Sequence, residues 1–599
     1  MKKNYIFKIL SSKMLVFKKI NFILTPKEAS RGFIFLFLMI IGMIFETLGI
    51  GMIAPLIHVI SDPTVLSSNS DFSVIINFLN IESYRSLVIT FSIGIVGIYI
   101  IKNCFLVYFS WYKIQYLTSL RMNLGNRIFK IYLSKPYSFH LAHNSGQLIQ
   151  NVSTEVSIFT GRFLAPSLVI FTESLIVIGI ISLLLFLEPL GTIILIIFLG
   201  LIAKLILSAT RKHIQKWGKE RQYHDGKKIQ HLQQGLGGIK DALLLGRIQF
   251  FLNRYKSHNL LSTKPDQKQS FLQEIPRLWI EVLAILGFSA MALVMVIQDN
   301  NATKIISILG VFGAAAFRLM PSVTRIIASI QSLRYSGMVL DSLYKEFSHA
   351  DMVDINNSKD YSHTNNFTKL SSEINISNIT FKYEGADRPS LLNVSLKIPI
   401  GKSIGLMGSS GSGKSTLVDI LLGLLKPDSG NIMVDGQNIN VNTRSWQNQV
   451  GYVPQSIYLI DSSLRNNIAY GVEEDSIDDR MIERVIKSAH LSDFVESLPE
   501  GINTYVGERG VRLSGGQKQR IGIARALYSD PDIIVLDEAS SSLDNKTEKQ
   551  IMNTVDELHL HKTILIVAHR LTTIEKCDWI YKLENGKIVE EGEPSSMLK

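Results

Sequence analysis

The chain has 599 residues, enough for several domains, and 46% of them are hydrophobic while only 19% are charged; with a mean hydropathy of +0.20, this excludes an ordinary soluble enzyme and places part of the chain in lipid. The net charge of +11 does not indicate a nucleic-acid partner, because Lys and Arg gather in the cytoplasmic loops of membrane proteins. The only two cysteines, Cys104 and Cys577, provide neither a disulfide framework nor a Cys-based metal site.

Six apolar runs follow one another in the first half of the chain. A helix needs roughly 20 such residues to span hydrocarbon, and the first run is interrupted by a single acid, Glu46. The last run is short and rich in Gly and Ala. The predicted spans are residues 33–60, 87–108, 163–187, 190–207, 278–297 and 305–319.

The distribution of basic residues predicts the orientation of these spans. Eight Lys and Arg residues precede Phe33, whereas the loop from His58 to Tyr84 has none. By the positive-inside rule the N-terminus is cytoplasmic, and six spans return the C-terminus to the same side. The first apolar run is too long for a signal peptide, so we expect a retained membrane anchor.

Segments outside the spans also show helical patterns. The cytoplasmic connections at about 113–162 and 209–276 carry apolar residues at helical spacing, which predicts that the membrane helices continue beyond the bilayer. In the outer loop, Asp71 to Asn80 has an apolar face with polar ends. This segment is interpreted as a short helix on the membrane or, equally well, as a simple surface helix.

A change of composition separates two domains. Between Asp351 and Glu373 the chain turns to Asn, Ser, Thr, Asp and Lys, as in a linker. We therefore predict a transmembrane domain at 1–345, a linker at 346–373 and a nucleotide-binding domain at 374–599. Short β-branched runs alternate with helical patterns in the last segment, so the fold class is a helical transmembrane domain fused to an α/β phosphate-loop ATPase domain.

A glycine-rich segment lies between a strand-like stretch, Ser403 to Met407, and a helical pattern, Thr416 to Leu425. This is the context that a phosphate loop requires, and a chance Gly-rich turn is the alternative. Backbone amides would bind phosphates of ATP, Lys414 would reach the β- and γ-phosphates, and the Ser415 hydroxyl would bind Mg²⁺. The predicted nucleotide-binding residues here are Gly408, Ser409, Ser410, Gly411, Ser412, Gly413, Lys414, Ser415 and Thr416.

Two adjacent acids end a second strand-like run, Ile533 to Asp537. Asp537 is positioned to hold Mg²⁺, and Glu538 to polarise the water that attacks the γ-phosphorus as a general base. Two solvated acids at a strand end are the alternative, which a neighbouring phosphate loop disfavours.

The run Leu513-Ser-Gly-Gly-Gln517 resembles the signature of the ATP-binding cassette (ABC) family. The resemblance implies that the signature of one subunit, Ser514, Gly515, Gly516 and Gln517, closes over the γ-phosphate held by a second subunit. It also implies roles for Tyr383 at the adenine ring, Gln455 at the metal and the attacking water, residues 541–544 at the dimer seam, and His569 at the γ-phosphate. Six spans followed by one cassette are typical of an exporter half-molecule. A homodimer is therefore expected, with an unseen partner as the alternative.

Charged residues in the predicted spans are costly in lipid and usually face a cavity or a partner. Lys102, Arg277 and Arg318 form a candidate site for an anionic head group, with Arg suited to bidentate phosphate binding. For Arg277 an i to i+4 pair with Glu281 is the alternative. For Arg325, at the end of the sixth span, the alternative is snorkelling to the interface.

The membrane half resembles PglK-type flippases of lipid-linked oligosaccharides in three segments, residues 46–55, 275–279 and 318–327. The resemblance implies that Lys102, Arg277 and Arg318 handle a lipid-linked pyrophosphate and that Asp71 to Asn80 engages the polyprenyl tail. It also implies a location in the bacterial inner membrane. At position 102 this chain has Lys where the family has Arg. The positive charge is kept, but the bidentate geometry of the guanidinium is lost.

The sequence thus predicts an ATP-driven flippase that moves a polyprenyl-pyrophosphate oligosaccharide for glycan assembly or protein glycosylation. The alternative is an ABC exporter of another amphiphile, such as lipid A core, a drug or a peptide. An ATP-gated channel and a cassette ATPase without transport are further alternatives, disfavoured by Glu538 and by the six spans respectively.

Overall fold

The computed structural model describes residues 15–52, 56, 60, 83–187, 189–297, 302–351, 370–507, 510–538, 553, 555, 557–559, 562–568 and 570–597. The chain divides into two compact units. One comprises Met1–Lys135 with His143–Ile355, and the other comprises Pro136–Ala142 with Asn356–Lys599. Each unit is described here by itself.

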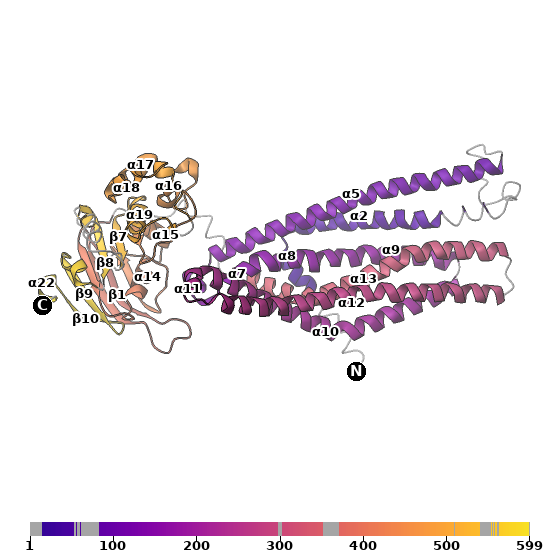
Figure 1. Ribbon diagram of the computed structural model, residues 1–599, viewed down its shortest axis with the longest axis horizontal. Helices are drawn as coiled ribbons and strands as arrows, with labels where there is room; N and C mark the ends of the chain where they lie inside the picture. The colour runs from indigo at the N-terminus through magenta and orange to yellow at the C-terminus, as the bar shows by residue number, and fades with distance from the viewer. Residues whose placement is uncertain are drawn as a thin grey trace. The chain divides into compact units, whose positions relative to one another are not determined.

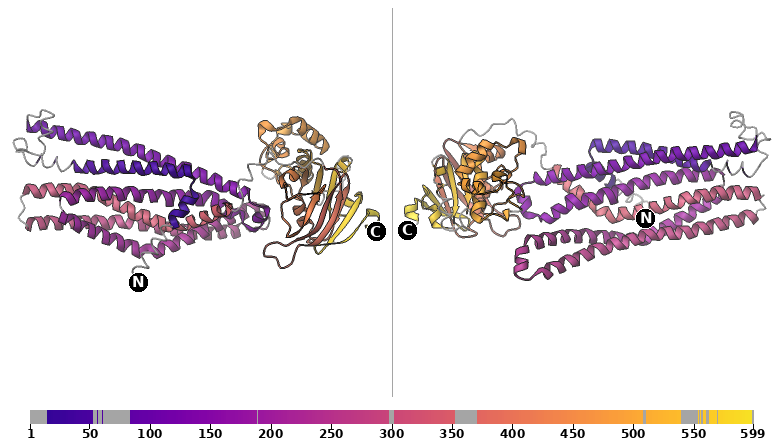
Figure 2. Two further views of the ribbon diagram at one scale, coloured as in Figure 1. Left: turned by 180° about the vertical axis from the view of Figure 1, so that it is seen from behind. Right: turned by 45° about the horizontal axis from the view of Figure 1, so that its top comes forward.

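The first unit is built from long helices that run beside one another (Figures 1 and 2). Its main helices are α2 (Pro26–Gly51), α5 (Tyr84–Leu133), α9 (Ala165–Leu187), α10 (Pro189–Gly237), α12 (Ile248–Ile297) and α13 (Ala302–Asp351). The start of α2 follows from local chemistry, because the Thr25 and Glu28 side chains cap each other's backbone amides and Pro26 opens the first turn.

Short elements connect these helices. The helices α7 (Ser145–Gln150) and α8 (Val156–Ile158) alternate with the π-helical turns η2 (Asn151–Glu155) and η3 (Phe159–Leu164) before α9 begins. The six-residue α11 (Ile239–Leu244) joins α10 to α12. The helix α6 (Tyr137–Ala142) follows α5 in the chain and belongs to the second unit.

Four helices among the described residues are long and apolar enough to cross a membrane: Pro26–Gly51, Tyr84–Leu133, Ser145–Phe186 and Gly191–Gly237. The fifth and sixth predicted spans, 278–297 and 305–319, lie within α12 and α13. With 50 residues each, α5, α12 and α13 are about 75 Å long, more than twice the roughly 30 Å of hydrocarbon. The predicted continuation of the membrane helices beyond the bilayer is therefore confirmed.

Apolar side chains lie both between these helices and on their outer surface, as in a bundle that faces lipid. Small apolar clusters hold the helices together, one around Ile176, Ile180 and Leu319 and another around Phe35 and Phe109. Many other large apolar side chains on the same helices point outward and are exposed. Water would penalise such a surface, whereas lipid tails would not.

The second unit contains two β-sheets. The larger has the order β10-β9-β3-β8-β7-β6 and joins β3 (Ser403–Met407), β6 (Val450–Val453), β7 (Ile533–Asp537), β8 (Thr563–Ala568), β9 (Trp579–Glu584) and β10 (Lys587–Gly592). All its pairs are parallel except β9 with β10. The smaller, antiparallel sheet has the order β2-β1-β4-β5 and joins β1 (Glu373–Phe381), β2 (Leu391–Pro399), β4 (Ser429–Val434) and β5 (Gln437–Asn438).

Helices surround these sheets, and two of them position the candidate site. They are α14 (Lys414–Leu421), which follows β3, and α19 (Gly515–Leu527), which precedes β7. Every residue of β7 and β8 is buried, as expected of strands covered on both faces. The remaining helices are α15 (Thr443–Asn448), α16 (Leu464–Ile468), η5 (Glu474–Ser476), α17 (Asp479–Ser488), α18 (Ser492–Glu496), η6 (Gly501–Asn503), α21 (Leu571–Ile574) and α22 (Pro594–Met597).

Candidate functional site

The glycine-rich loop connects β3 to α14, as the sequence predicts. Gly408 and Gly413 have φ angles of 157° and 108°, in the region that L side chains rarely adopt. A Cβ atom at Gly408 would lie 2.2 Å from the carbonyl oxygen of Leu583, and one at Gly413 would lie 2.7 Å from that of Ser390. Both positions therefore require glycine, which keeps the backbone amides of the loop accessible to a phosphate.

The amine of Lys414 is held inside this loop. Its Nζ donates to the carbonyl oxygens of Gly408 at 2.9 Å and Ser409 at 3.0 Å. Burial lowers the pKa of Lys414, although the nearby carboxylates of Glu538 and Asp537 oppose the shift. The Oγ of Ser412 is buried and has no hydrogen-bond partner among the described residues. A pocketed ammonium and an unpartnered hydroxyl among loop amides fit the phosphates of ATP.

The two acids after β7 lie in different surroundings. Asp537 is buried, and the hydroxyl of Tyr452 donates to its Oδ2 at 3.4 Å. Glu538 has a φ of 49°, which is unusual for a residue with a Cβ, and its Oε2 accepts a hydrogen bond of 2.7 Å from Nε2 of Gln455. The structure thus brings Gln455, Glu538 and Asp537 together next to Lys414.

A further acid, Asp419, belongs to this group and was not among the predicted site residues. It lies on α14, five residues after Lys414, and is half-buried. Burial, followed by the charge of Asp537, raises the pKa of Asp419 to about 6. Its signal in the sequence is weak, because a single acid in an amphipathic helix is usually solvated.

Tyr383, predicted to stack on adenine, lies beside the start of α14. Its hydroxyl is 3.1 Å from Oγ1 of Thr416, and its ring meets that of Phe381 edge to face, with centroids 4.9 Å apart. The residue is therefore fixed near the phosphate loop, and its contact with adenine stays a prediction.

The signature segment forms the start of α19. Ser514 is the N-cap residue and exchanges side-chain to backbone hydrogen bonds with Gln517 in a capping box. Gly515 and Gly516 form the first turn of this 13-residue helix, where free amides and the helix dipole favour an anion. Among the described residues, no hydrogen bond or ion pair joins this segment to the phosphate loop of the same chain.

Two predicted parts of the nucleotide site lie outside the described residues. They are His569, which follows the end of β8, and the segment 541–544. The same holds for the outer segment Asp71 to Asn80. Their predicted roles stay predictions.

Two of the three predicted membrane cations, Lys102 and Arg318, are paired with acids in the structure. Glu46 of α2 accepts from Lys102 of α5 at 3.3 Å and from Arg318 of α13 at 3.0 Å. On α9, Glu173 lies 3.5 Å from Arg318 and 2.8 Å from Arg325. We call these five residues the membrane charge cluster.

Arg277 does not belong to this cluster in the described part of the chain. It is exposed on α12, and no described residue forms an ion pair with it, including Glu281. The structure therefore brings two of the three predicted substrate cations together and leaves Arg277 apart. Glu173 was missed by the sequence reasoning, although an acid within the apolar run 163–187 is itself a signal.

Comparisons with known proteins agree with this architecture. The family model of the ABC transporter matches residues 391–541, and that of the ABC transporter transmembrane region matches residues 32–314. The ATP-dependent lipid A-core flippase of Shigella flexneri is 30% identical over 527 residues, covering 86% of this chain and 87% of that protein. The same-named protein of Vibrio cholerae is 28% identical over 525 residues and covers 87% of each chain.

A solved structure shares the fold. The ATP-bound structure of a bacterial Atm1-family ABC exporter superposes with a TM-score of 0.73 at 22% identity, covering 92% of this chain and 96% of that one. The predicted fold class and the prediction of ATP hydrolysis coupled to transport are confirmed. The chain belongs to the ABC transporters, as an exporter-type half-transporter that joins one transmembrane region to one ATP-hydrolysing cassette.

Proposed function

We propose that the chain moves a lipid with a phosphorylated, sugar-bearing head group from the cytoplasmic to the outer leaflet of the bacterial inner membrane, driven by ATP hydrolysis in a homodimer. The membrane charge cluster is the observation that carries this proposal. Its members come from four helices, α2, α5, α9 and α13. Charges in such a place are costly and are retained where they serve a pathway.

The composition of the cluster favours an anionic head group. Three cations face two carboxylates, which leaves one excess positive charge in each chain. The side chains of Glu46 and Lys102 are only 6% and 10% exposed, so their charges interact in a medium that screens them weakly. A phosphate that reaches the cluster would replace a carboxylate as the partner of Arg318 and form the bidentate bonds that guanidinium favours.

The relatives bear on the identity of the lipid. Those at 30% identity are named for lipid A core, which was the alternative in the sequence analysis, and we now place that class of substrate first. The polyprenyl-pyrophosphate oligosaccharide is the second candidate, supported by the PglK-like segments. Two features on which it depended carry less support, since Arg277 lies outside the cluster and Asp71 to Asn80 lies outside the described residues.

ATP and Mg²⁺ fit the cassette, and the proposal assigns its residues accordingly. The loop 408–416 and Tyr383 would bind ATP, while Ser415, Gln455 and Asp537 would hold Mg²⁺, which neutralises phosphate charge when bound. Glu538 would accept the proton of the attacking water, oriented by Gln455, with which it already shares a hydrogen bond. His569 would contact the γ-phosphate, and Ser514 to Gln517 of the second copy would close the site. The cassette and the N-terminus would both be cytoplasmic.

Transport in proteoliposomes tests the proposal. Labelled lipid A core and labelled polyprenyl-pyrophosphate oligosaccharide are supplied separately, and ATP-dependent movement is compared for wild type, Glu538→Gln, Arg318→Ala and the matched control Arg85→Ala. Arg85 is exposed at the start of α5, outside the membrane charge cluster. We expect Glu538→Gln to stop movement, since loss of a general base costs about 10²–10⁴ in rate.

The other variants decide the role of the cluster. Arg318→Ala is expected to reduce movement strongly, whereas Arg85→Ala should leave it unchanged. Movement unaffected by Arg318→Ala would refute a phosphate-binding role of the cluster. Movement that survives Glu538→Gln would refute hydrolysis as the driving step. Equal movement of an uncharged drug or peptide would favour a general exporter, and ATP turnover without any movement would favour a channel or regulator.

A further inference from the structure

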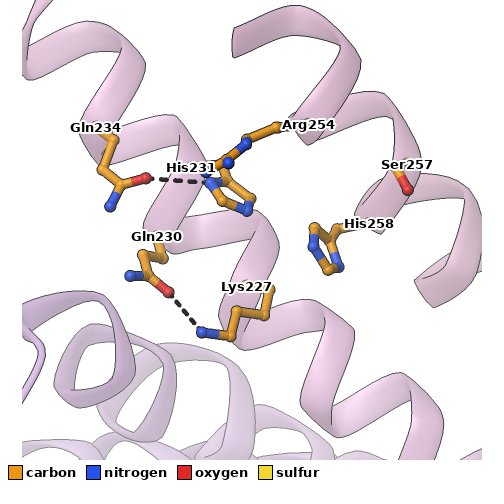
Figure 3. Close-up of a pocket in the computed structure, with 7 residues that line it drawn as sticks. All are labelled: Lys227, Gln230, His231, Gln234, Arg254, Ser257 and His258. Atoms are coloured by element: carbon orange, nitrogen blue, oxygen red, sulfur yellow. Dashed lines mark hydrogen bonds between the residues drawn. The ribbon is translucent and has the colours of Figure 1, made fainter. Parts of the chain in front are cut away.

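A pocket of about 440 Å³ lies between α10 and α12 of the first unit, and none of its lining residues belongs to the membrane charge cluster (Figure 3). Its lining residues on α10 are Lys227, Gln230, His231 and Gln234, and those on α12 are Arg254, Ser257 and His258. On α10 the positions follow Lys227 by three, four and seven residues, and on α12 they follow Arg254 by three and four, so each set occupies one face. The two faces meet because α10 and α12 pack along each other.

The lining of this pocket is positively charged and contains no carboxylate. The Nζ of Lys227 donates to the neutral Oε1 of Gln230 at 3.1 Å, and the guanidinium of Arg254 lies 4.6 Å from the centre of the Phe250 ring. Within the described part of the chain, neither cation forms an ion pair. Asp225 of the same helix is already bonded to Arg221, Lys228 and Ser262.

Three imidazoles lie close together beside these cations. The Nδ1 atoms of His224 and His258 are 2.9 Å apart, and the His258 ring stacks on that of His231 with centroids 5.1 Å apart. Burial lowers the pKa of His258, and the neighbouring His224, His231, Lys227 and Arg254 lower it further. The short helix α7, which also packs on α10, has no charged residue between Ser145 and Gln150. An anion would relieve the repulsion among these groups.

Two other occupants fit less well. Among the described residues, no three His, Cys, Asp or Glu side chains have the arrangement of a metal site. A lipid head group is too far away, because Lys227 lies 20 residues beyond the predicted end of the fourth span at Leu207, about 30 Å along a helix. The remaining partner is a soluble anion with more than one charge.

We propose that the pocket between α10 and α12 binds a soluble, multiply charged phosphate-type anion, such as pyrophosphate or the phosphates of a nucleotide. Lys227 and Arg254 supply the permanent charge, one from each helix, so the anion bridges the two helices. The imidazoles of His231 and His258 supply protonatable donors, and Gln230 and Gln234 supply amides. The helix α11 connects α10 to α12 a short distance beyond Gln234. The bound anion would therefore stiffen this end of the helix pair.

Pyrophosphate binding to the full-length protein in neutral-lipid nanodiscs tests the proposal by calorimetry. Every sample carries Lys414→Ala. This substitution removes the ammonium of the phosphate loop and weakens phosphate binding there, so that the measured binding reports on the pocket. The test variant is Lys227→Gln/Arg254→Gln. Its matched control is Lys219→Gln/Lys256→Gln, which removes the same charge from exposed positions of α10 and α12 outside the pocket.

We expect the test variant to lose affinity at least about tenfold and the control to bind like the parent. Affinity in the parent should rise severalfold as the pH falls below about 6.5 and His258 gains a proton, and His258→Asn should weaken that rise. An absence of binding, or an equal loss in the control, would overturn the proposal. Competition by nanodiscs of anionic lipid would instead assign the pocket to a head group. Thermal melting of both double variants shows whether each is folded.

Discussion

At the scale of the residue, Gly408 shows how a single missing side chain makes a nucleotide site possible. Its φ is 157°, and a Cβ would lie 2.2 Å from the carbonyl oxygen of Leu583. Gly436 is a matched control, because it has a φ of 83° and open space around it. Gly436→Ala should cost only about 1–2 kcal/mol of stability, from backbone strain. We expect Gly408→Ala to displace the loop as well.

ATP-dependent thermal stabilisation measures this difference. Wild type and Gly436→Ala should be stabilised by ATP to the same extent, because the stabilisation by a ligand depends on the logarithm of its concentration over Kd, and Gly436→Ala should leave Kd unchanged. Gly408→Ala should show little or no stabilisation at the same ATP concentration. Equal stabilisation of all three proteins would contradict the assignment of this loop to phosphate.

Asp419 gives a second prediction at this scale, on pH. Its folded-state pKa is about 6, against an ordinary 3.8, so the folded protein prefers the protonated form. Ionisation therefore costs stability as pH rises from about 4 to 6, and the cost stays constant above that range. Asp419→Asn removes the cost and should stabilise the protein by about 1 kcal/mol at neutral pH, once solvent screening of a half-exposed carboxyl is allowed for.

Thermal unfolding of the full-length protein in detergent from about pH 4.5 to pH 8 checks this sign. The advantage of Asp419→Asn over wild type should grow with pH and level off above about pH 6. Asp387→Asn, at an exposed position, should show no such trend. A variant that is destabilised at neutral pH would contradict the burial of an ionised Asp419.

At the scale of the element, the membrane charge cluster ties four helices together, and Glu46 is its most connected acid. Glu46→Gln leaves Lys102 and Arg318 without that counter-charge. Removing one partner of a buried ion pair costs about 3–5 kcal/mol in soluble proteins, so the melting temperature in detergent should fall clearly. Glu281→Gln is the control, since Glu281 is exposed and forms no ion pair with any described residue.

The same variant probes the proposed substrate. If a lipid phosphate replaces the Glu46 carboxylate, then adding the transported lipid should stabilise Glu46→Gln more than wild type. An uncharged lipid should not have this effect. If Glu46→Gln melts like wild type, the ion pairs contribute little to stability, and the cluster does not hold these helices together.

Elements were predicted better than the contacts between them. Apolar runs and helical spacing were sufficient for the long helices, and the strand–loop–helix pattern was sufficient for the phosphate loop, because these signals are local. The pairing of Glu46 with Arg318 joins residues 272 positions apart, and nothing in either segment specifies the other. The position of β3 between β8 and β9 likewise depends on pairing between strands that are far apart in the sequence, which no local pattern specifies.

At the scale of the whole molecule, the proposed function makes the phosphate loop and the signature of one chain parts of two different nucleotide sites. The phosphate loop and the capped signature helix are both formed, yet no hydrogen bond or ion pair joins them among the described residues. If each site combines the loop of one copy with the signature of the other, two inactive variants should complement each other. Lys414→Ala disables only the loop, and Ser514→Glu places a negative charge where the γ-phosphate would bind.

Mixed dimers of these two variants give the decisive measurement. One of their two sites contains both substitutions, whereas the other pairs a native loop with a native signature. Differently tagged copies are co-expressed, the mixed dimer is isolated by both tags, and its ATPase rate is compared with that of each variant alone. We expect each variant alone to be inactive and the mixed dimer to regain turnover. If the sites formed within one chain, every copy would carry a defect and no turnover would return, so restored hydrolysis would establish that a second copy completes the site.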